Sequence, residues 1–360
     1  MTGDLASREQ TEKRTGMRRL AWMLPLVLVL AVCLTFAASA YLAQTTSVIA
    51  DFAKSETQRV KAVNGVYLYD AGYIDDADRL LLGQIPHDDF SQGGVYFIGD
   101  SKMIVSLLPY LMTPEERRLI HNYSIGGLRH DEERDLFRML VEECGLLRAG
   151  GKNTTIFIDV SYYRARPKTG AVRLSYYVQR HGLYTYKPGE GMHVAPIPPI
   201  ERFINFQRDY AQRFLEIVFH LRQSAVIGQA PENKTKASRV LGDTWRAEMT
   251  KQVGELTALI DYLQSRGVHV VAIYPPSGSW DDEMPYAPTY YGLVGPILKA
   301  RGVPIMDQGD TFTDSDFADA AHLKYSAAVR EHEANLAAAR RALADMGVTL
   351  PPSTPPAKGE

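Results

Sequence analysis

Short apolar runs that alternate with helical segments are the feature of this sequence that most limits its possible folds. The apolar runs lie at residues 95–98, 155–158, 268–274 and 303–306. Continuous runs of this kind suit strands that are buried on both faces of a parallel sheet. Helical patterns open at residue 113 and near residues 131, 245 and 290. The alternation predicts a doubly wound α/β fold with a mostly parallel sheet flanked by helices.

The regular alternation is interrupted over residues 162–233. A stretch of this length is too long for a simple connection in such a sheet, so we expect an inserted segment there. The predicted α/β domain spans residues 95–346 and follows a stalk and lead-in segment at residues 44–94. The proline-rich carboxyl end, residues 347–360, is expected to form a disordered tail.

An uncharged segment near the amino terminus is long enough to cross a membrane. No charged residue occurs between Arg19 and Asp51, and a hydrocarbon core of about 30 Å needs roughly 20 apolar residues. Basic residues precede the segment, so we expect a cytoplasmic tail at residues 1–19 and a single transmembrane anchor at residues 20–43. The main domain would then lie outside the cytoplasmic membrane, in the periplasm if the cell has an outer membrane. Small residues at 38–40 leave a cleaved signal peptide as the alternative.

Charge and cysteine content exclude several classes of partner. A formal net charge of −2 argues against a protein built to neutralise the phosphates of nucleic acid. The two cysteines, Cys33 and Cys144, supply neither a disulfide framework nor a cysteine-based zinc site. The sequence also lacks a phosphate-binding glycine loop and a helical pair of metal-binding histidines. We therefore expect no nucleic-acid partner, no metal and no cofactor.

A serine follows the first apolar run, at the place where open α/β sheets carry their catalytic groups. The run ends in Gly99-Asp100-Ser101, and the carboxyl ends of parallel strands line the crevice of such a sheet. Near the other end of the chain, Asp319 precedes His322 by one helical turn. A serine nucleophile needs a base, and an imidazole base needs a carboxylate to fix its tautomer. Taken alone, each motif also fits a structural role, a turn for the first and a helix cap for the second.

Together these motifs resemble the SGNH/GDSL hydrolase family, whose flavodoxin-like α/β fold carries a Gly-Asp-Ser block after the first strand and an Asp-x-x-His block near the carboxyl end. The segment His121–Gly127 is similar to the family's second block. The resemblance implies that Ser101 is the nucleophile and that Asp319 and His322 complete a triad. It also implies an oxyanion hole made by the amide of Ser101 and by the turn that contains Ser124, Gly126 and Gly127.

The family's third block is where this sequence departs from the pattern. That block ends a strand with Gly-x-Asn-Asp, and its asparagine completes the oxyanion hole. Here residues 156–162 contain no asparagine. Ser161 falls closest to its place and could donate a hydroxyl, whereas Asp159 would repel an oxyanion if it pointed inward. Loss of one oxyanion donor costs a factor of about 10² to 10³ in turnover, so the hole is either rebuilt or weak.

The inserted segment gives the only indication of the substrate. Tyrosine rings stack on sugars, and arginine forks bind carboxylates or phosphates. The candidate substrate-binding residues are Tyr162, Tyr163, Arg164 and Arg166. A solvated loop whose tyrosines pack on the core is the alternative interpretation.

The layout of the chain is similar to that of membrane-anchored family members, the D-alanyl transfer protein of teichoic-acid modification and the O-acetylation proteins of alginate. Those proteins work beside a membrane-bound O-acyltransferase. The resemblance implies an enzyme that transfers or hydrolyses acyl esters of an envelope polysaccharide or glycolipid. A simple esterase or lipase-like hydrolase is one alternative. An inactive carbohydrate-binding scaffold of a polymer-secretion machine is the other.

Overall fold

A computed structural model describes residues 23–35, 37, 79–85, 88–108, 111–165, 167, 174–175, 178, 184–187, 189–195 and 244–350. The expected cytoplasmic tail, residues 44–78 of the stalk and lead-in segment and the end of the carboxyl tail lie outside these residues, as does most of the expected insertion. The expected anchor is described only in part, where residues 23–35 are helical. Within the described part of the chain, no helix is both long and apolar enough to cross a membrane.

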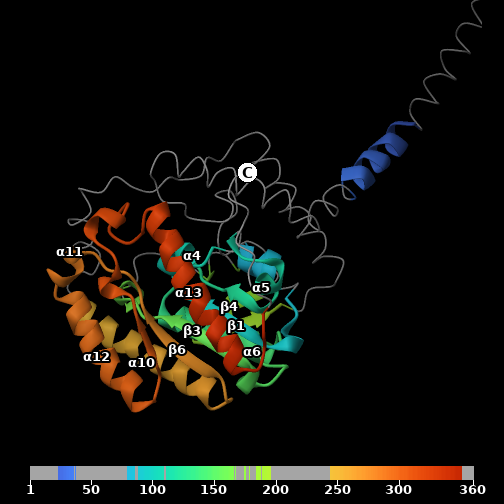
Figure 1. The fold of residues 1–360 in the computed structure, drawn as a ribbon. Helices are drawn as coiled ribbons and strands as arrows, with labels where there is room; N and C mark the ends of the chain where they lie inside the picture. Colours follow the sequence, from blue (N-terminus) through green and yellow to red (C-terminus); the bar gives the residue numbers. More distant parts are fainter. Residues whose placement is uncertain are drawn as a thin grey trace, which may run out of the picture.

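Five parallel strands form the central sheet of the protein (Figure 1). Their order across the sheet is β2-β1-β3-β6-β7. Counted along the chain, this is the 2-1-3-4-5 order of one common doubly wound fold, in which the direction of winding reverses beside the first strand. The predicted α/β class with a parallel sheet is therefore confirmed. The strands are β1 (Gly94–Ile98), β2 (Ile120–Asn122), β3 (Thr154–Asp159), β6 (His269–Tyr274) and β7 (Ile305–Asp307).

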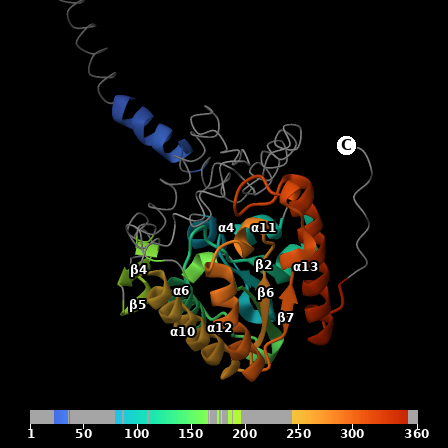
Figure 2. The ribbon, with the colours of Figure 1, turned by 90° about the vertical axis from the view of Figure 1, so that its left-hand side faces the viewer.

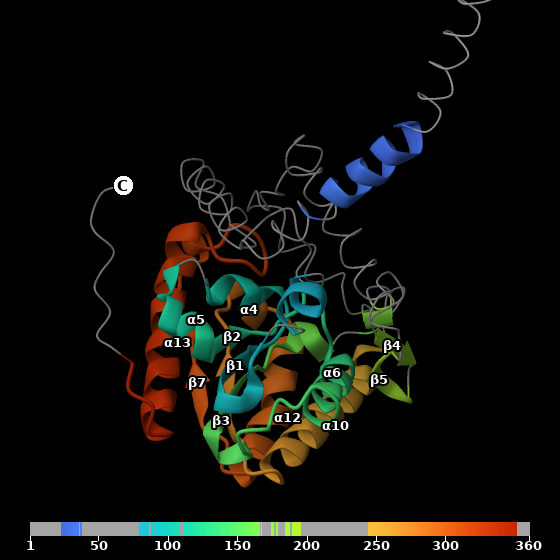
Figure 3. The same ribbon diagram turned by 90° about the vertical axis from the view of Figure 1, so that its right-hand side faces the viewer.

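Helices cover both faces of the sheet, as the buried strands predict (Figure 3). Alternate residues of β1 point to opposite faces, so Tyr96 and Ile98 join one core while Val95 and Phe97 join the other. The first core is closed by α6 (His130–Glu142), α10 (Trp245–Gln264) and α12 (Tyr286–Ala300). The second is closed by α4 (Ser101–Ser106) and α13 (Tyr325–Asp345), with α5 (Pro114–Leu119) beside them.

Short elements complete the described structure. An antiparallel hairpin of β4 (Tyr184–Lys187) and β5 (Gly191–Val194) lies in the expected insertion and stands apart from the central sheet (Figure 2). The short helix α11 (Ser279–Asp282) follows β6. Single helical turns occur at η1 (Arg79–Gln84), η2 (Phe90–Gln92), η4 (Gly151–Asn153), η5 (Tyr162–Ala165), η7 (Gly309–Thr311) and η8 (Asp314–Asp316).

Two strand assignments differ from the sequence analysis. β2 was not expected, because its three residues include His121 and Asn122 and form no apolar run. The last strand lies at Ile305–Asp307, two residues later than its predicted start, because the apolar residue Val303 packs into the core before the strand begins. Neither difference moves the carboxyl edge of the sheet, where the candidate site lies.

Candidate functional site

Ser101 lies just beyond the carboxyl end of β1 and is the first residue of α4. A glycine is needed at position 99, because a Cβ there would come within 2.6 Å of the Asp159 Cβ and 2.7 Å of the Met103 Cβ. Asp100 caps the helix, since its Oδ1 accepts a hydrogen bond from the Lys102 amide at 2.9 Å. The residues on either side are buried, whereas Ser101 is partly exposed. This strand, turn and helix therefore bring one hydroxyl to the surface.

A continuous chain of hydrogen bonds joins the three residues that the sequence analysis selected. Nε2 of His322 lies 2.8 Å from Oγ of Ser101. Nδ1 of the same imidazole lies 2.9 Å from Oδ1 and 2.8 Å from Oδ2 of Asp319. Both ring nitrogens are engaged, one by the hydroxyl and one by the carboxylate. This is the geometry that general-base activation of a serine requires.

The loop that carries Asp319 and His322 is closed on itself. An isolated antiparallel bridge joins Phe317 to Leu323, and Oδ1 of Asp319 accepts hydrogen bonds from the amides of Ala321 and His322 at 2.8 Å each. Burial alone would raise the pKa of the Asp319 carboxyl, but the imidazole and these amides outweigh it and lower that pKa below its ordinary value. Asp319 is thus held as the charged partner that orients the imidazole.

Two aromatic side chains hold this loop from outside. Nε1 of Trp280 donates to the carbonyl of Ala320 at 3.1 Å, and Oη of Tyr163 lies 3.3 Å from the same oxygen. Asp281 anchors the tyrosines in turn, because its Oδ1 accepts a hydrogen bond from Oη of Tyr162 at 2.6 Å. The carbonyl of Ala320, which lies between Asp319 and His322 in the chain, is therefore held by Trp280 and Tyr163.

Tyr162 and Tyr163 lie at a different place from the one expected of exposed sugar-binding residues. Tyr162 is only 2 % exposed, and the two rings stack on each other with centroids 4.2 Å apart. The Lys102 ammonium lies 4.9 Å from the centroid of the Tyr163 ring and donates to the carbonyl of Pro276 at 3.1 Å. These contacts give both tyrosines a structural role behind the loop of Asp319 and His322.

Arg164 does not fit its expected role in substrate binding, because it is 1 % exposed. Its guanidinium pairs with Glu133 at 2.5 Å and donates to the carbonyl of Asp159 at 2.6 Å. A buried guanidinium paired in this way serves the packing of the domain. The remaining candidate, Arg166, lies outside the described residues.

The turn expected to bind the oxyanion lies directly beside the serine turn. The amide of Ile125, three residues beyond β2, donates to the carbonyl of Gly99 at 3.1 Å. This bond extends the parallel pairing of β1 and β2 as far as the turn that carries Ser101. The amide of Ser124 is already bonded to Oδ1 of Asn122 at 3.1 Å. Gly126 and Gly127 form the centre of a tight turn, and Gly127 adopts a φ of 72° that favours glycine. The amide of Ser124 is thus already used in a hydrogen bond within the fold and does not serve as an oxyanion donor.

The segment after β3 is also buried. Ser161 is fully buried, and its Oγ accepts a hydrogen bond from the Tyr163 amide at 3.3 Å. Asp159 is fully buried as well, and burial followed by the nearby charge of Asp100 raises the pKa of its carboxyl well above the ordinary value. The raised pKa favours the uncharged acid. An uncharged Asp159 would not repel an oxyanion, contrary to the concern raised by the sequence.

Comparisons of the chain with protein families and with curated proteins found no match. No protein-family model matches the chain, and no curated protein shows significant similarity to it. Among the described residues, no group of three or more histidine, cysteine, aspartate or glutamate side chains is placed to hold a metal ion.

The sequence analysis missed two residues that support the loop of Asp319 and His322 through other side chains. Asp281 carries no sequence signal, because its role depends on two tyrosines more than a hundred residues earlier in the chain. Lys102 could have been noticed, because a lysine directly after the serine sits at the base of the expected crevice. Its burial to 4 % exposure was not evident from the sequence.

Proposed function

We propose that this protein is a serine acyl-transfer enzyme, an O-acyltransferase or esterase that acts on acyl esters through Ser101, His322 and Asp319. The single observation that supports this most directly is the 2.8 Å contact between Nε2 of His322 and Oγ of Ser101. The Asp319 carboxylate on the opposite nitrogen supports it further. Ser101 and the Asp319–His322 pair come from distant parts of the sequence, and their contact supports the proposal.

The proposed reaction proceeds in two balanced steps. His322 Nε2 takes the proton of the Ser101 hydroxyl as Oγ attacks the acyl carbonyl carbon, and the same proton then passes to the departing alcohol oxygen. The acyl group is left on Oγ as an ester. In the second step His322 accepts a proton from an incoming hydroxyl as its oxygen attacks the acyl carbon. The bond from that carbon to Oγ then breaks, and Nε2 returns the proton to Oγ of Ser101. Asp319 stabilises the imidazolium ion formed in each step.

The incoming hydroxyl decides between transfer and hydrolysis, and we propose that it belongs to a sugar. The resemblance to SGNH/GDSL proteins of envelope modification supports this choice. A hydroxyl held against the acyl-enzyme can gain an effective concentration of about 10⁵ M or more. The proposed substrate is an envelope polysaccharide or glycolipid, with a membrane-bound O-acyltransferase as a proposed partner.

The proposed location is the outer side of the cytoplasmic membrane. It rests on the uncharged stretch at residues 20–43 and on the basic residues before it. A reporter fused after Glu360 should be active only outside the cytoplasm. Activity of the reporter inside the cell would contradict this location.

A fluorophosphonate probe tests the nucleophile directly. The full chain should be labelled at one serine, and Ser101→Ala should abolish the labelling. Ser106→Ala is the matched control, because Ser106 lies in the same helix but is buried and bonded to the carbonyl of Met103 at 3.0 Å. Labelling that survives in Ser101→Ala, or a folded native protein that is never labelled, would contradict the proposal.

The direction of the reaction is tested with an activated acyl ester, supplied with and without oligosaccharide acceptors. We expect acylated sugar to exceed free acid at saturating acceptor. If free acid dominates with both acidic and neutral acceptors, the protein is an esterase.

A further inference from the structure

Residues 275–282 and residues 309–323 form one body, which we call the histidine block because the second segment contains His322. The amide of Ser279 donates to Oδ1 of Asp314 at 2.8 Å, and its hydroxyl donates to Oδ2 at 2.6 Å. These two bonds join the loop that follows β6 to the loop that precedes α13.

An apolar cluster adds to the hydrogen bonds within the histidine block. The ring of Trp280 packs edge-on against Phe317, with centroids 5.3 Å apart, and Leu323 belongs to the same cluster. The indole nitrogen of Trp280 also donates to the carbonyl of Ala320. Because side chains from both segments pack against each other, a shift of one segment carries the other with it.

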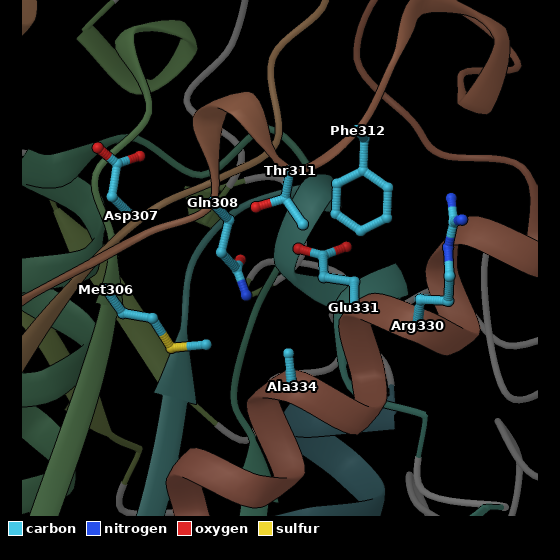
Figure 4. Close-up of a pocket in the computed structure, with 8 residues that line it drawn as sticks. All are labelled: Met306, Asp307, Gln308, Thr311, Phe312, Arg330, Glu331 and Ala334. Carbon is cyan, nitrogen blue, oxygen red and sulfur yellow. The ribbon is translucent and has the colours of Figure 1, made fainter.

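The histidine block has fewer packing contacts on the side that faces α13. A pocket of about 270 Å³ lies there, between the block, β7 and α13. Figure 4 shows Thr311 and Phe312 of the block across this pocket from Ala334 of α13. Since the pocket leaves part of this side unpacked, contacts elsewhere contribute more to holding His322 beside Ser101.

Lys102 connects the serine turn to the histidine block. It directly follows Ser101 in α4, and its amide donates to Oδ1 of Asp100 at 2.9 Å. Its ammonium donates to the carbonyl of Pro276, in the block, at 3.1 Å. Lys102 is only 4 % exposed, so this bond is shielded from water, in which it would be weaker. One residue therefore belongs to the serine turn through its backbone and contacts the block through its side chain.

A second contact between Lys102 and the block runs through Tyr163. The ammonium lies 4.9 Å from the centroid of the tyrosine ring, within the range of a cation–π interaction. Oη of Tyr163 lies 3.3 Å from the carbonyl oxygen of Ala320 and 3.4 Å from Oδ1 of Asp281, both in the block. Burial raises the pKa of the Asp281 carboxyl, and the charge of Lys102 opposes that rise. The ammonium thus interacts with the block by a hydrogen bond, through an aromatic ring and through its charge.

We infer that Lys102 is a positioning residue that sets the location of His322 relative to Ser101. The inference rests on the proposed function. Lys102 acts through the histidine block and not on the reacting atoms. Without the ammonium, the block would keep its internal bonds, including the one between Asp319 and His322, but would be held less precisely beside the serine. A displacement of about 1 Å can lower a rate by about 10²-fold.

The first test measures labelling of the full chain by a fluorophosphonate probe over a range of probe concentrations. Lys102→Met keeps the length of the apolar stem and removes the ammonium. Its maximal labelling rate should fall about 10-fold to 100-fold, because the imidazole is displaced. The half-saturating probe concentration should change less than threefold, since the probe still binds to the same surface.

Two further variants separate the ammonium from general loosening of the helix. Lys102→Arg keeps a cation and N–H donors, so it should label at least threefold faster than Lys102→Met. Val105→Ala is the matched control, because it truncates another buried side chain of α4 and leaves the ammonium in place. Its labelling rate should stay within threefold of the native rate. If Lys102→Met does not fold, Lys102→Gln takes its place, because its shorter neutral side chain cannot reach as far.

A second readout distinguishes a displaced block from a damaged one. The downfield Nδ1 proton signal of His322 reports its bond to Asp319, which lies within the block. We expect this signal to persist in Lys102→Met while the labelling rate falls.

The outcomes separate this inference from the proposed function. A folded native protein that is never labelled would contradict both. If the native protein is labelled at Ser101, the proposed function stands, and any of four results overturns the inference alone. These are a Lys102→Met rate within threefold of the native rate, a Lys102→Arg rate no faster than that of Lys102→Met, an equal loss in Val105→Ala, and loss of the downfield signal in Lys102→Met.

Discussion

Replacing Asp319 by asparagine should stop His322 from acting as a base while leaving the shape of the loop unchanged. Oδ1 of Asp319 accepts two backbone amides at 2.8 Å, so the asparagine must keep its own oxygen in that place. Its NH₂ group then replaces Oδ2 opposite Nδ1 of His322. This NH₂ donor opposes a proton on Nδ1, and Oδ1, which remains 2.9 Å from Nδ1, already accepts the two amides. The substitution therefore favours the tautomer protonated on Nε2, which donates toward Ser101 and cannot accept the proton of the serine.

The size of the effect follows from the loss of general-base catalysis. That contribution is typically 10² to 10⁴, and the change of tautomer in a serine triad lies near the upper end. We therefore expect the second-order rate constant for fluorophosphonate labelling to fall by about 10³ to 10⁴. At 25 °C this is about 4 to 5 kcal/mol in activation free energy.

The assay compares labelling rates of Asp319→Asn and native protein at pH 7, with thermal unfolding to check that both are folded. Asp316→Asn is a suitable control, because Asp316 lies in the same loop but its side chain contacts Arg330 and Thr313. A folded Asp319→Asn protein that labels within tenfold of the native rate would refute the reasoning, since the imidazole would then not depend on the carboxylate.

Three further predictions concern the surroundings of the triad. Tyr163→Phe and Trp280→Phe should each lower the labelling rate about tenfold and broaden the downfield Nδ1 proton signal of His322, whereas Tyr162→Phe should change neither. Arg164→Met should destabilise the fold by about 3 to 5 kcal/mol in urea unfolding, because it removes the guanidinium that pairs with the buried Glu133, and Glu133→Gln in the same chain should recover part of the loss. Burial lowers the pKa of His332 to about 4, so its neutral form contributes stability that is complete above about pH 6.5 and is lost as the pH falls toward 4. Relative to His332→Gln, the native protein should therefore lose up to about 3 kcal/mol between pH 7 and pH 4, and a constant difference would contradict this.

The sequence was most informative where a pattern is set by local rules. Apolar runs between helical segments located four of the five strands of the sheet, because a strand buried on both faces must be apolar throughout. The serine turn was visible for a similar reason, since only glycine fits between Asp159 of β3 and Met103. Asp319 and His322 were visible because their spacing is local to one turn.

The parts that the sequence could not supply depend on distant contacts. Arg164 and Tyr162 were assigned to an exposed binding surface because basic and aromatic residues crowd the sequence there. Their burial depends on Glu133 of α6 and Asp281 of α11, which come from two other helices. β2 was missed because its pairing with β1, and not its composition, makes it a strand.

The hydrogen bond between His322 and Ser101 joins residues separated by 221 positions in the chain. Closing so large a loop costs conformational entropy that no local contact repays, so the two halves of the site meet only after the sheet between them has assembled. Under the proposed function, the serine of a partly folded chain would be an ordinary alcohol, because the imidazole would not yet be beside it. Labelling at position 101 would then report that folding is complete, and a newly made chain would not attack esters before it reaches its final shape.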